Sequence, residues 1–189
     1  NKNLLAKKSL IDQIDIYFAR ANILHKKSNY EESSKYYKLA NKLKLKFRPS
    51  QADNVIKKSK QLLFESDKIS CYQIDQSSSV ENIFIVGMPR SGSSLVESIL
   101  TMNKIVYGLG EIDFLEKSFL ETRKNDQNLG LSDLYYMKLN PQKGNCLITT
   151  NKCLYNYQYA GIIAQKIPNS KIIHCYRNPL DNILSIYRA

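Results

Sequence analysis

The chain of 189 residues is long enough to bury one substantial core, and its 43% hydrophobic and 24% charged residues are ordinary proportions for a globular protein. They exclude a disordered tail. No apolar run reaches the roughly 20 residues that a membrane span requires, and the lysine-rich N-terminus lacks the apolar stretch of a secretory signal. We therefore expect a cytoplasmic protein.

The formal net charge of +11 is concentrated in the N-terminal third. Residues 1–62 contain 15 Lys and Arg against 5 Asp and Glu, a local charge of +10, which leaves +1 for residues 63–189. The lysines are scattered around helical faces, and neither a stacked aromatic platform nor a nucleic-acid motif accompanies them. Nucleic acid is therefore not an expected partner.

The four cysteines form no CxxC pair and lie in or beside apolar segments. This spacing disfavours a metal cluster and favours buried, reduced thiols, which fits a cytoplasmic location. The chain begins at Asn1 instead of Met and stops at Ala189 inside a predicted helix, which indicates a fragment of a longer protein.

Residues 4–43 have apolar side chains at helical spacing, interrupted at Ser28-Asn29, which predicts two helices. The stretch YFARANILHKKSNYEESSKYYKLANKL resembles a tetratricopeptide repeat, although Ser33 replaces the usual alanine and only one repeat is visible. A plain helical hairpin is the alternative. If the resemblance holds, this segment could bind a protein partner or mediate self-association. The residues that carry it are Ala21, Leu24, Tyr30, Tyr37 and Ala40.

A further polar helix is predicted over residues 49–64, and residues 65–82, with Ser77 to Ser79, are predicted to form a linker. From Ile83 onward, apolar strands alternate with helical segments, which predicts a parallel, doubly wound α/β sheet like that of the P-loop NTPases. The predicted strands are 83–86, 146–150 and 171–176, and the predicted helices are 93–102, 155–166 and 180 onward. Residues 111–142 are predicted to be mostly helical with a break at Gly130.

The stretch IFIVGMPRSGSSLVESIL is a strand, a glycine loop and a helix, the layout of a Walker A loop. Gly87 and Gly92 free the backbone to curl, so that the amides from Arg90 to Ser94 can converge on an anion at the helix N-terminus. The Walker lysine is replaced by Ser93, which disfavours triphosphate chemistry. Arg90 instead offers a guanidinium suited to a planar fork of oxygens.

This loop resembles the 5′-phosphosulfate loop of sulfotransferases, which commonly reads PRSGTT. The resemblance implies a sulfotransferase fold, truncated at its C-terminal end, with 3′-phosphoadenosine-5′-phosphosulfate as the donor and no metal. It implies that Arg90, Ser91, Gly92, Ser93 and Ser94 bind the donor. The order of a helical repeat followed by such a domain resembles that of bacterial sulfotransferases with tetratricopeptide repeats. Those proteins are related in their donor loop to protein-tyrosine sulfotransferases.

A second motif, SKIIHCYRNPLDNILSIYRA, supports the same resemblance. Arg177 follows a predicted strand and Ser185 lies eight residues further on, and in the sulfotransferase family an Arg and Ser at this separation bind the 3′-phosphate of the donor. Pro179 suits the first turn of the intervening helix, and Asp181 suits its positive end. The family more often has Asp where this chain has Asn178.

Three residues are predicted to carry the chemistry. By resemblance to the tyrosylprotein branch, Glu111 in VYGLGEIDF is the base, although a glutamate in a first helical turn can also simply stabilise the helix. Lys152 in ITTNKCLY resembles the family lysine that contacts the transferring group, and Arg90 would stabilise the bridging oxygen. His174 is expected to be packed within a strand and not to act as a base.

The sequence therefore predicts a sulfotransferase that acts on a hydroxyl or amine of a small molecule or a protein, with protein tyrosine as one candidate. Two alternatives stay open: a small-molecule kinase on the same P-loop fold, which would require Mg²⁺ and ATP, and a non-catalytic interaction protein whose helical repeat binds a partner.

Overall fold

The computed structural model describes residues 8–68, 81–124 and 129–189. The chain forms two compact units. The α/β unit comprises Ile56–Arg177, and the helical unit comprises Asn1–Val55 together with Asn178–Ala189. Most of the predicted linker, residues 69–80, lies outside the described residues, so the domain boundaries proposed from the sequence stay predictions.

The α/β unit is built on a parallel sheet of four strands in the order β2-β3-β1-β4. Their bounds are β1 Asn82–Gly87, β2 Val106–Gly108, β3 Ile148–Asn151 and β4 Ser170–Cys175. The apolar run Ile83 to Val86 forms β1 at the centre, where Phe84 and Ile85 are completely buried, as a strand covered on both faces must be. The predicted parallel α/β architecture is confirmed.

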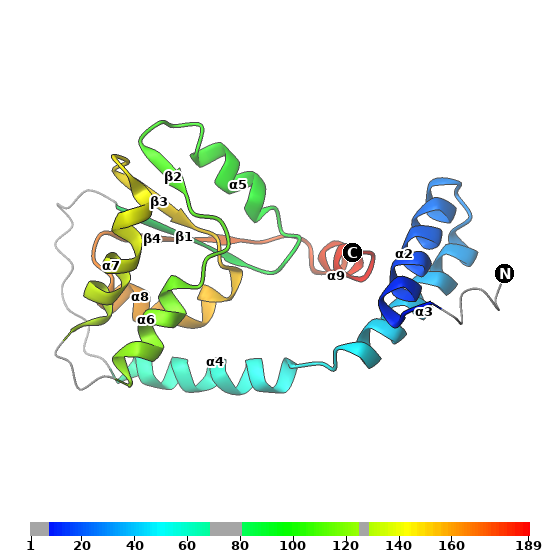
Figure 1. Ribbon diagram of the computed structural model, residues 1–189, viewed down its shortest axis with the longest axis horizontal. Coiled ribbons are helices and arrows are strands. Elements are labelled where there is room, and N and C mark those ends of the chain that lie inside the picture. Colours follow the sequence, from blue (N-terminus) through cyan, green and yellow to red (C-terminus); the bar gives the residue numbers. More distant parts are fainter. Residues whose placement is uncertain (1–7, 69–80, 125–128) are drawn as a thin grey trace. The chain divides into compact units, whose positions relative to one another are not determined.

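Helices cover the two faces of this sheet (Figure 1). On one face lies α5 (Ser93–Leu100), and on the other lie α6 (Phe114–Thr122), α7 (Leu131–Lys143) and α8 (Ala160–Lys166), which follows the 3₁₀ turn η1 (Leu154–Tyr159). The main core cluster joins Phe84 and Val86 of β1 to the second group of helices, and α4 (Ala52–Asp67) adds Leu62. The other buried members are Leu115, Phe119, Leu131, Tyr135, Leu139, Tyr159, Ile162, Ile163 and Ile167.

Local sequence signals account for most of these elements. The predicted break at Gly130 is confirmed, because Gly130 is the N-cap of α7 and its N–H donates to Asp133 Oδ2 at 2.9 Å. The predicted helix over 155–166 begins as the 3₁₀ turn η1. Strand β2 was not predicted, because its three residues are too few to show an alternating pattern.

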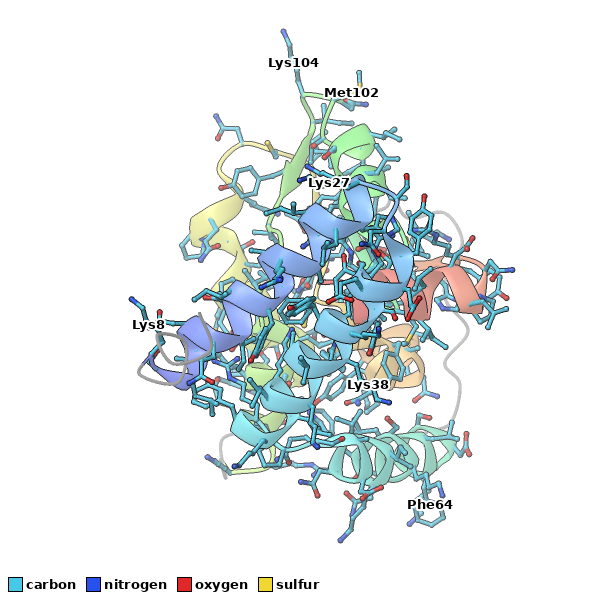
Figure 2. The ribbon with its side chains drawn as sticks, turned by 90° about the vertical axis from the view of Figure 1, so that its right-hand side faces the viewer. Lys8, Lys27, Lys38, Phe64, Met102 and Lys104 are labelled. Carbon is cyan, nitrogen blue, oxygen red and sulfur yellow. The ribbon has the colours of Figure 1, made fainter. Side chains whose placement is uncertain are left out.

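The helical unit is formed by α2 (Leu10–Lys26), α3 (Tyr30–Phe47) and α9 (Pro179–Tyr187). Ser9 and Asn29 accept first-turn N–H groups and so cap α2 and α3, while Ser28 adopts a positive φ in the turn between them. Figure 2 shows α2 and α3 side by side, with Lys27 at this turn and Lys38 on α3. The predicted pair of helices is confirmed.

Small residues allow α2 and α3 to pack closely. Ala21 and Ala40 are fully buried, and Tyr37 Oη donates to Asn22 Oδ1 at 2.6 Å across the pair. Tyr30, which also carries the resemblance to the repeat, is the first residue of α3 and is 60% exposed, with its ring against His25. Whether this pair is a tetratricopeptide repeat stays a prediction.

Helix α9 packs against α3 within the helical unit. Asn41 Nδ2 donates to the Tyr187 carbonyl at 2.8 Å, and the rings of Tyr37 and Tyr187 lie 6.3 Å apart. These contacts join the last described helix to the first pair. Throughout the described parts of the chain, every helix is too short or too polar to cross a bilayer.

Candidate active site

The loop after β1 turns sharply before α5 begins. Gly87, Arg90 and Gly92 all have positive φ, at 142°, 68° and 96°. Both the N–H and the hydroxyl of Ser91 donate to the Met88 carbonyl, at 3.3 and 2.7 Å. The turn is therefore closed by its own backbone and one serine.

The N-terminus of α5 points out of this loop without a side-chain cap. Gly92 is the N-cap residue, and its carbonyl accepts the N–H groups of Leu95 and Val96 at 3.0 and 3.1 Å. The earlier N–H groups of a helix have no intrahelical acceptor, and Gly92 provides no side chain to accept one. The first turn, with Ser93 buried and Ser94 exposed, is thus chemically suited to an anion.

The start of the loop is pressed against the neighbouring strand. Gly87 pairs with Cys175 of β4, and a Cβ atom built on Gly87 would lie 2.4 Å from the Cys175 carbonyl oxygen. Only glycine fits here. The close approach fixes the carboxyl end of β4 directly beside the loop.

Arg177 extends from this end of β4 toward the loop. Its Nη1 donates to the Arg90 carbonyl at 3.4 Å, so the two arginines predicted to bind the donor lie close together. Both residues are exposed. The Arg177 guanidinium therefore contacts the loop that precedes the uncapped N-terminus of α5, an arrangement that favours an anion.

Glu111 and Lys152 form an ion pair, with 2.7 Å between Lys152 Nζ and Glu111 Oε1. The lysine side chain is only 9% exposed, whereas that of the glutamate is 68% exposed. The carboxylate is therefore accessible from solvent, while the ammonium group is shielded behind it.

The backbone around this pair continues the β2–β3 ladder beyond the strand ends. The Leu109 N–H donates to the Thr150 carbonyl at 3.0 Å, and the Lys152 N–H donates to the Gly110 carbonyl at 2.8 Å. Gly110 then turns the chain with a φ of 66°. This turn brings together two residues that are 41 positions apart in the sequence.

Buried amides support the turn that carries Lys152. Asn151 Oδ1 accepts the Cys153 N–H at 3.0 Å and Asn156 Nδ2 at 3.1 Å, and both asparagines are 1% exposed. Burial raises the pKa of the half-buried Cys153 thiol, and nearby carboxylates add to this rise. Cys153 therefore stays protonated at neutral pH and adds no charge beside Lys152.

The sequence did not point to Glu97, although its side chain contacts both the Gly110 turn and strand β3. Its Oε1 atom accepts the Gly110 N–H at 3.1 Å and the Thr150 hydroxyl at 2.9 Å. A glutamate among the apolar residues of a short helix, in LVESIL, was the available signal. Its partners could not have been read from the sequence, because they lie 13 and 53 positions away.

Ser185, the predicted partner of Arg177, lies half-buried on α9 in the helical unit, so its place at the donor site stays a prediction. Asn178 caps α9, because its side chain accepts the N–H groups of Leu180 and Asp181 at 3.0 and 3.3 Å. Pro179 opens that helix, as predicted. Asn caps a helix about as well as Asp, which explains how this chain tolerates its departure from the family motif.

His174, expected to be packed, is instead exposed. It lies on β4, the last strand of the sheet order, where only one neighbouring strand is present in the described sheet. Of the cysteines, Cys175 is buried, Cys146 and Cys153 are half-buried, and Cys71 lies outside the described residues. Across the ranges that the structure describes, no group of three or more His, Cys, Asp or Glu side chains could hold a metal ion.

The fold is that of a parallel α/β protein, with a glycine-containing turn between β1 and an uncapped helix N-terminus. A sequence model described as "Sulfotransferase family" matches residues 82–189, more than half of the chain. The chain therefore belongs to the sulfotransferase family.

One curated relative is an uncharacterized protein of Aquifex aeolicus (strain VF5), 32% identical over 129 residues. The match takes in 56% of this chain and only 17% of the relative's own length. No solved structure matches the chain significantly.

Proposed function

We propose that this chain binds 3′-phosphoadenosine-5′-phosphosulfate and transfers its sulfonate to an acceptor hydroxyl or amine. The observation that carries the proposal is the shared edge of the sheet. The loop after β1, the Glu111–Lys152 pair beyond β3 and Arg177 beyond β4 all follow the carboxyl ends of neighbouring parallel strands. Ligands of open α/β sheets bind at this edge.

The donor would be held by the loop and by Arg177. The amides and hydroxyls of residues 91–94 would cradle the 5′-phosphosulfate, since an uncapped helix N-terminus favours an anion. Arg177 and Ser185 would bind the 3′-phosphate. A guanidinium suits this role because it can donate two parallel hydrogen bonds to phosphate oxygens.

Transfer would break the bond between sulfur and the bridging oxygen, form a bond from sulfur to the acceptor atom, and leave adenosine 3′,5′-bisphosphate. Glu111 would take the acceptor proton, and its exposed carboxylate supports this role, because a base must reach its substrate. Lys152 and Arg90 would stabilise the negative charge on the sulfonate and on the leaving oxygen.

The acceptor could be a small molecule or a protein, including a protein tyrosine. The helical unit would then recruit a protein acceptor or a second copy of the chain. We also propose a metal-free reaction, which titration in EDTA tests in part. A cytoplasmic location is proposed as well, because the cysteine spacing favours reduced thiols.

The proposal is tested by calorimetric titration in EDTA with adenosine 3′,5′-bisphosphate and with 5′-AMP, and separately by titration with ATP and Mg²⁺. We expect a clear preference for the bisphosphate. Preference for magnesium-ATP would support the kinase alternative, and absence of binding by all three ligands would refute donor binding by this chain.

The 3′-phosphate contact is tested with Arg177→Ala. This variant loses one charge-assisted contact, which contributes about 1.5–3 kcal/mol. Its affinity for the bisphosphate should therefore fall roughly 10- to 100-fold, while its affinity for 5′-AMP should not change. Lys171→Ala is the matched control, since it removes an exposed positive charge from the same strand away from its carboxyl end. Equal losses for both ligands in Arg177→Ala would rule out the assigned contact.

A further inference from the structure

Glu97 links its own helix α5 to the Gly110 turn and to β3, three segments whose relative positions matter for the proposed reaction. It lies on α5, the helix that begins at the donor loop, and a single oxygen of its side chain, Oε1, accepts from Gly110 and from Thr150. Gly110 immediately precedes Glu111, and Thr150 comes two residues before Lys152. Glu97 Oε1 therefore contacts the backbone of the residue next to Glu111 and the side chain of a residue two positions before Lys152.

We propose that Glu97 is a positioning residue, which holds the Glu111–Lys152 pair in register with the donor loop without itself contacting donor or acceptor. The part of this proposal that concerns turnover rests on the sulfonate transfer proposed above. The part that concerns the Gly110 turn rests on the structure alone.

Hydrogen bonds are what hold the Gly110 turn. Its N–H donates to Glu97 and its carbonyl accepts from the Lys152 N–H, so both polar groups of this residue are used. A Cβ atom built on Gly110 would meet nothing within 4 Å, so side-chain packing does not press on the turn from that direction. Loss of the Glu97 contact should therefore leave the residue before Glu111 much less constrained.

Gly108 of β2 lies at the point where α5 packs against the sheet. A Cβ atom built on Gly108 of β2 would lie 3.8 Å from Cγ and Cδ of Glu97 and only 2.9 Å from Thr101 Cγ2. A bare backbone at this point lets α5 approach β2 closely. Glu97 can then reach across the end of β2 to Thr150 on β3.

The two contacts need an oxygen acceptor and not a negative charge. In Glu97→Gln the amide oxygen can still accept from Gly110 and Thr150, whereas Glu97→Ala removes both contacts. Comparison of these variants separates acceptor geometry from charge. Thr150→Val removes one contact while keeping a side chain of similar size, and it provides a milder variant should Glu97→Ala fold poorly.

The test combines amide hydrogen exchange, measured by NMR on the whole chain, with kinetics. In Glu97→Ala we expect the Gly110 and Lys152 amides to exchange about tenfold faster. We also expect kcat for sulfonate transfer to fall by about 10²-fold, as misplaced catalytic groups do, while the Kd for adenosine 3′,5′-bisphosphate changes less than threefold. Glu97→Gln should stay close to the natural protein in all three measurements, and Thr150→Val should be intermediate.

Glu121→Ala is the matched control, since it removes a helical glutamate that pairs with Lys138 on α7 and lies away from the loop. It should not change exchange at Gly110. Unchanged Gly110 exchange in both Glu97→Ala and Thr150→Val would overturn the proposal, and so would equal damage in Glu97→Gln and Glu97→Ala. If the natural chain neither binds the bisphosphate nor transfers sulfonate, the proposed function fails, but the exchange measurements still decide whether Glu97 fixes the turn.

Discussion

Substitution of Gly87 by alanine tests the close approach between β1 and β4. Two separate costs arise at this position. The backbone φ of 142° is strained for any residue with a side chain, and the new methyl group would lie 2.4 Å from the Cys175 carbonyl oxygen. That oxygen belongs to the backbone of a paired strand, so it cannot move aside as a flexible side chain could.

The magnitude follows from the two terms. Backbone strain of this kind costs about 1–3 kcal/mol, and overpacking against a rigid neighbour costs a further 1–3 kcal/mol or so. Gly87→Ala should therefore lower the free energy of unfolding by about 2–6 kcal/mol, a large part of the roughly 5–15 kcal/mol typical of a domain. Gly92 also has an unusual φ, of 96°, but a Cβ atom built on it meets nothing within 4 Å. Gly92→Ala should therefore lower the free energy of unfolding by the backbone strain alone.

The assay is urea denaturation of the natural protein and both variants, followed by circular dichroism and fitted with a common slope. We expect Gly87→Ala to be less stable than Gly92→Ala by about 1–3 kcal/mol, the overpacking term alone. Equal losses of stability in the two variants would show that the close contact with Cys175 does not constrain the loop.

Two further predictions concern the cores. Ser33 is 1% exposed and its hydroxyl donates to the Ala21 carbonyl at 2.8 Å, so Ser33→Val should cost about 1–3 kcal/mol by overpacking, whereas Ser33→Ala should cost no more than about 1.5 kcal/mol in the same urea assay. Burial raises the pKa of Tyr135, Tyr136 and Tyr159 above the ordinary tyrosine value of about 10. As the pH rises, these tyrosines ionise in the unfolded chain before they ionise in the folded one, so the folded protein should lose stability above about pH 10. The loss should be smaller in Tyr135→Phe. Unchanged urea midpoints between pH 8 and 11 would contradict this prediction.

The alternation of apolar strands and helical segments was sufficient to predict the α/β architecture. A strand buried at the centre of a sheet is a continuous apolar run in the sequence, and the run from Ile83 to Val86 predicted the position of β1 closely. Helix ends were less exact, since capping depends on local geometry. Strand β2 escaped prediction because its pairing with β3, and not its own sequence, makes it a strand.

The candidate site was only partly accessible from the sequence. Resemblance to a family pointed to Glu111 and Lys152 one by one, but their ion pair depends on the Gly110 turn and on the pairing of β2 with β3. Glu97 was missed for the same reason, because a carboxylate that accepts from a distant backbone N–H leaves no local pattern. His174 was misjudged because the burial of a strand side chain depends on what packs against that face of the sheet, which the local sequence does not show.

The order of the strands also decides where the described sheet can grow. Its two edges are β2, with three residues, and β4, with six. A further strand, from this chain or from another, would find twice as many backbone positions to pair with along β4. A strand added there would be the direct neighbour of the strand that Arg177 follows.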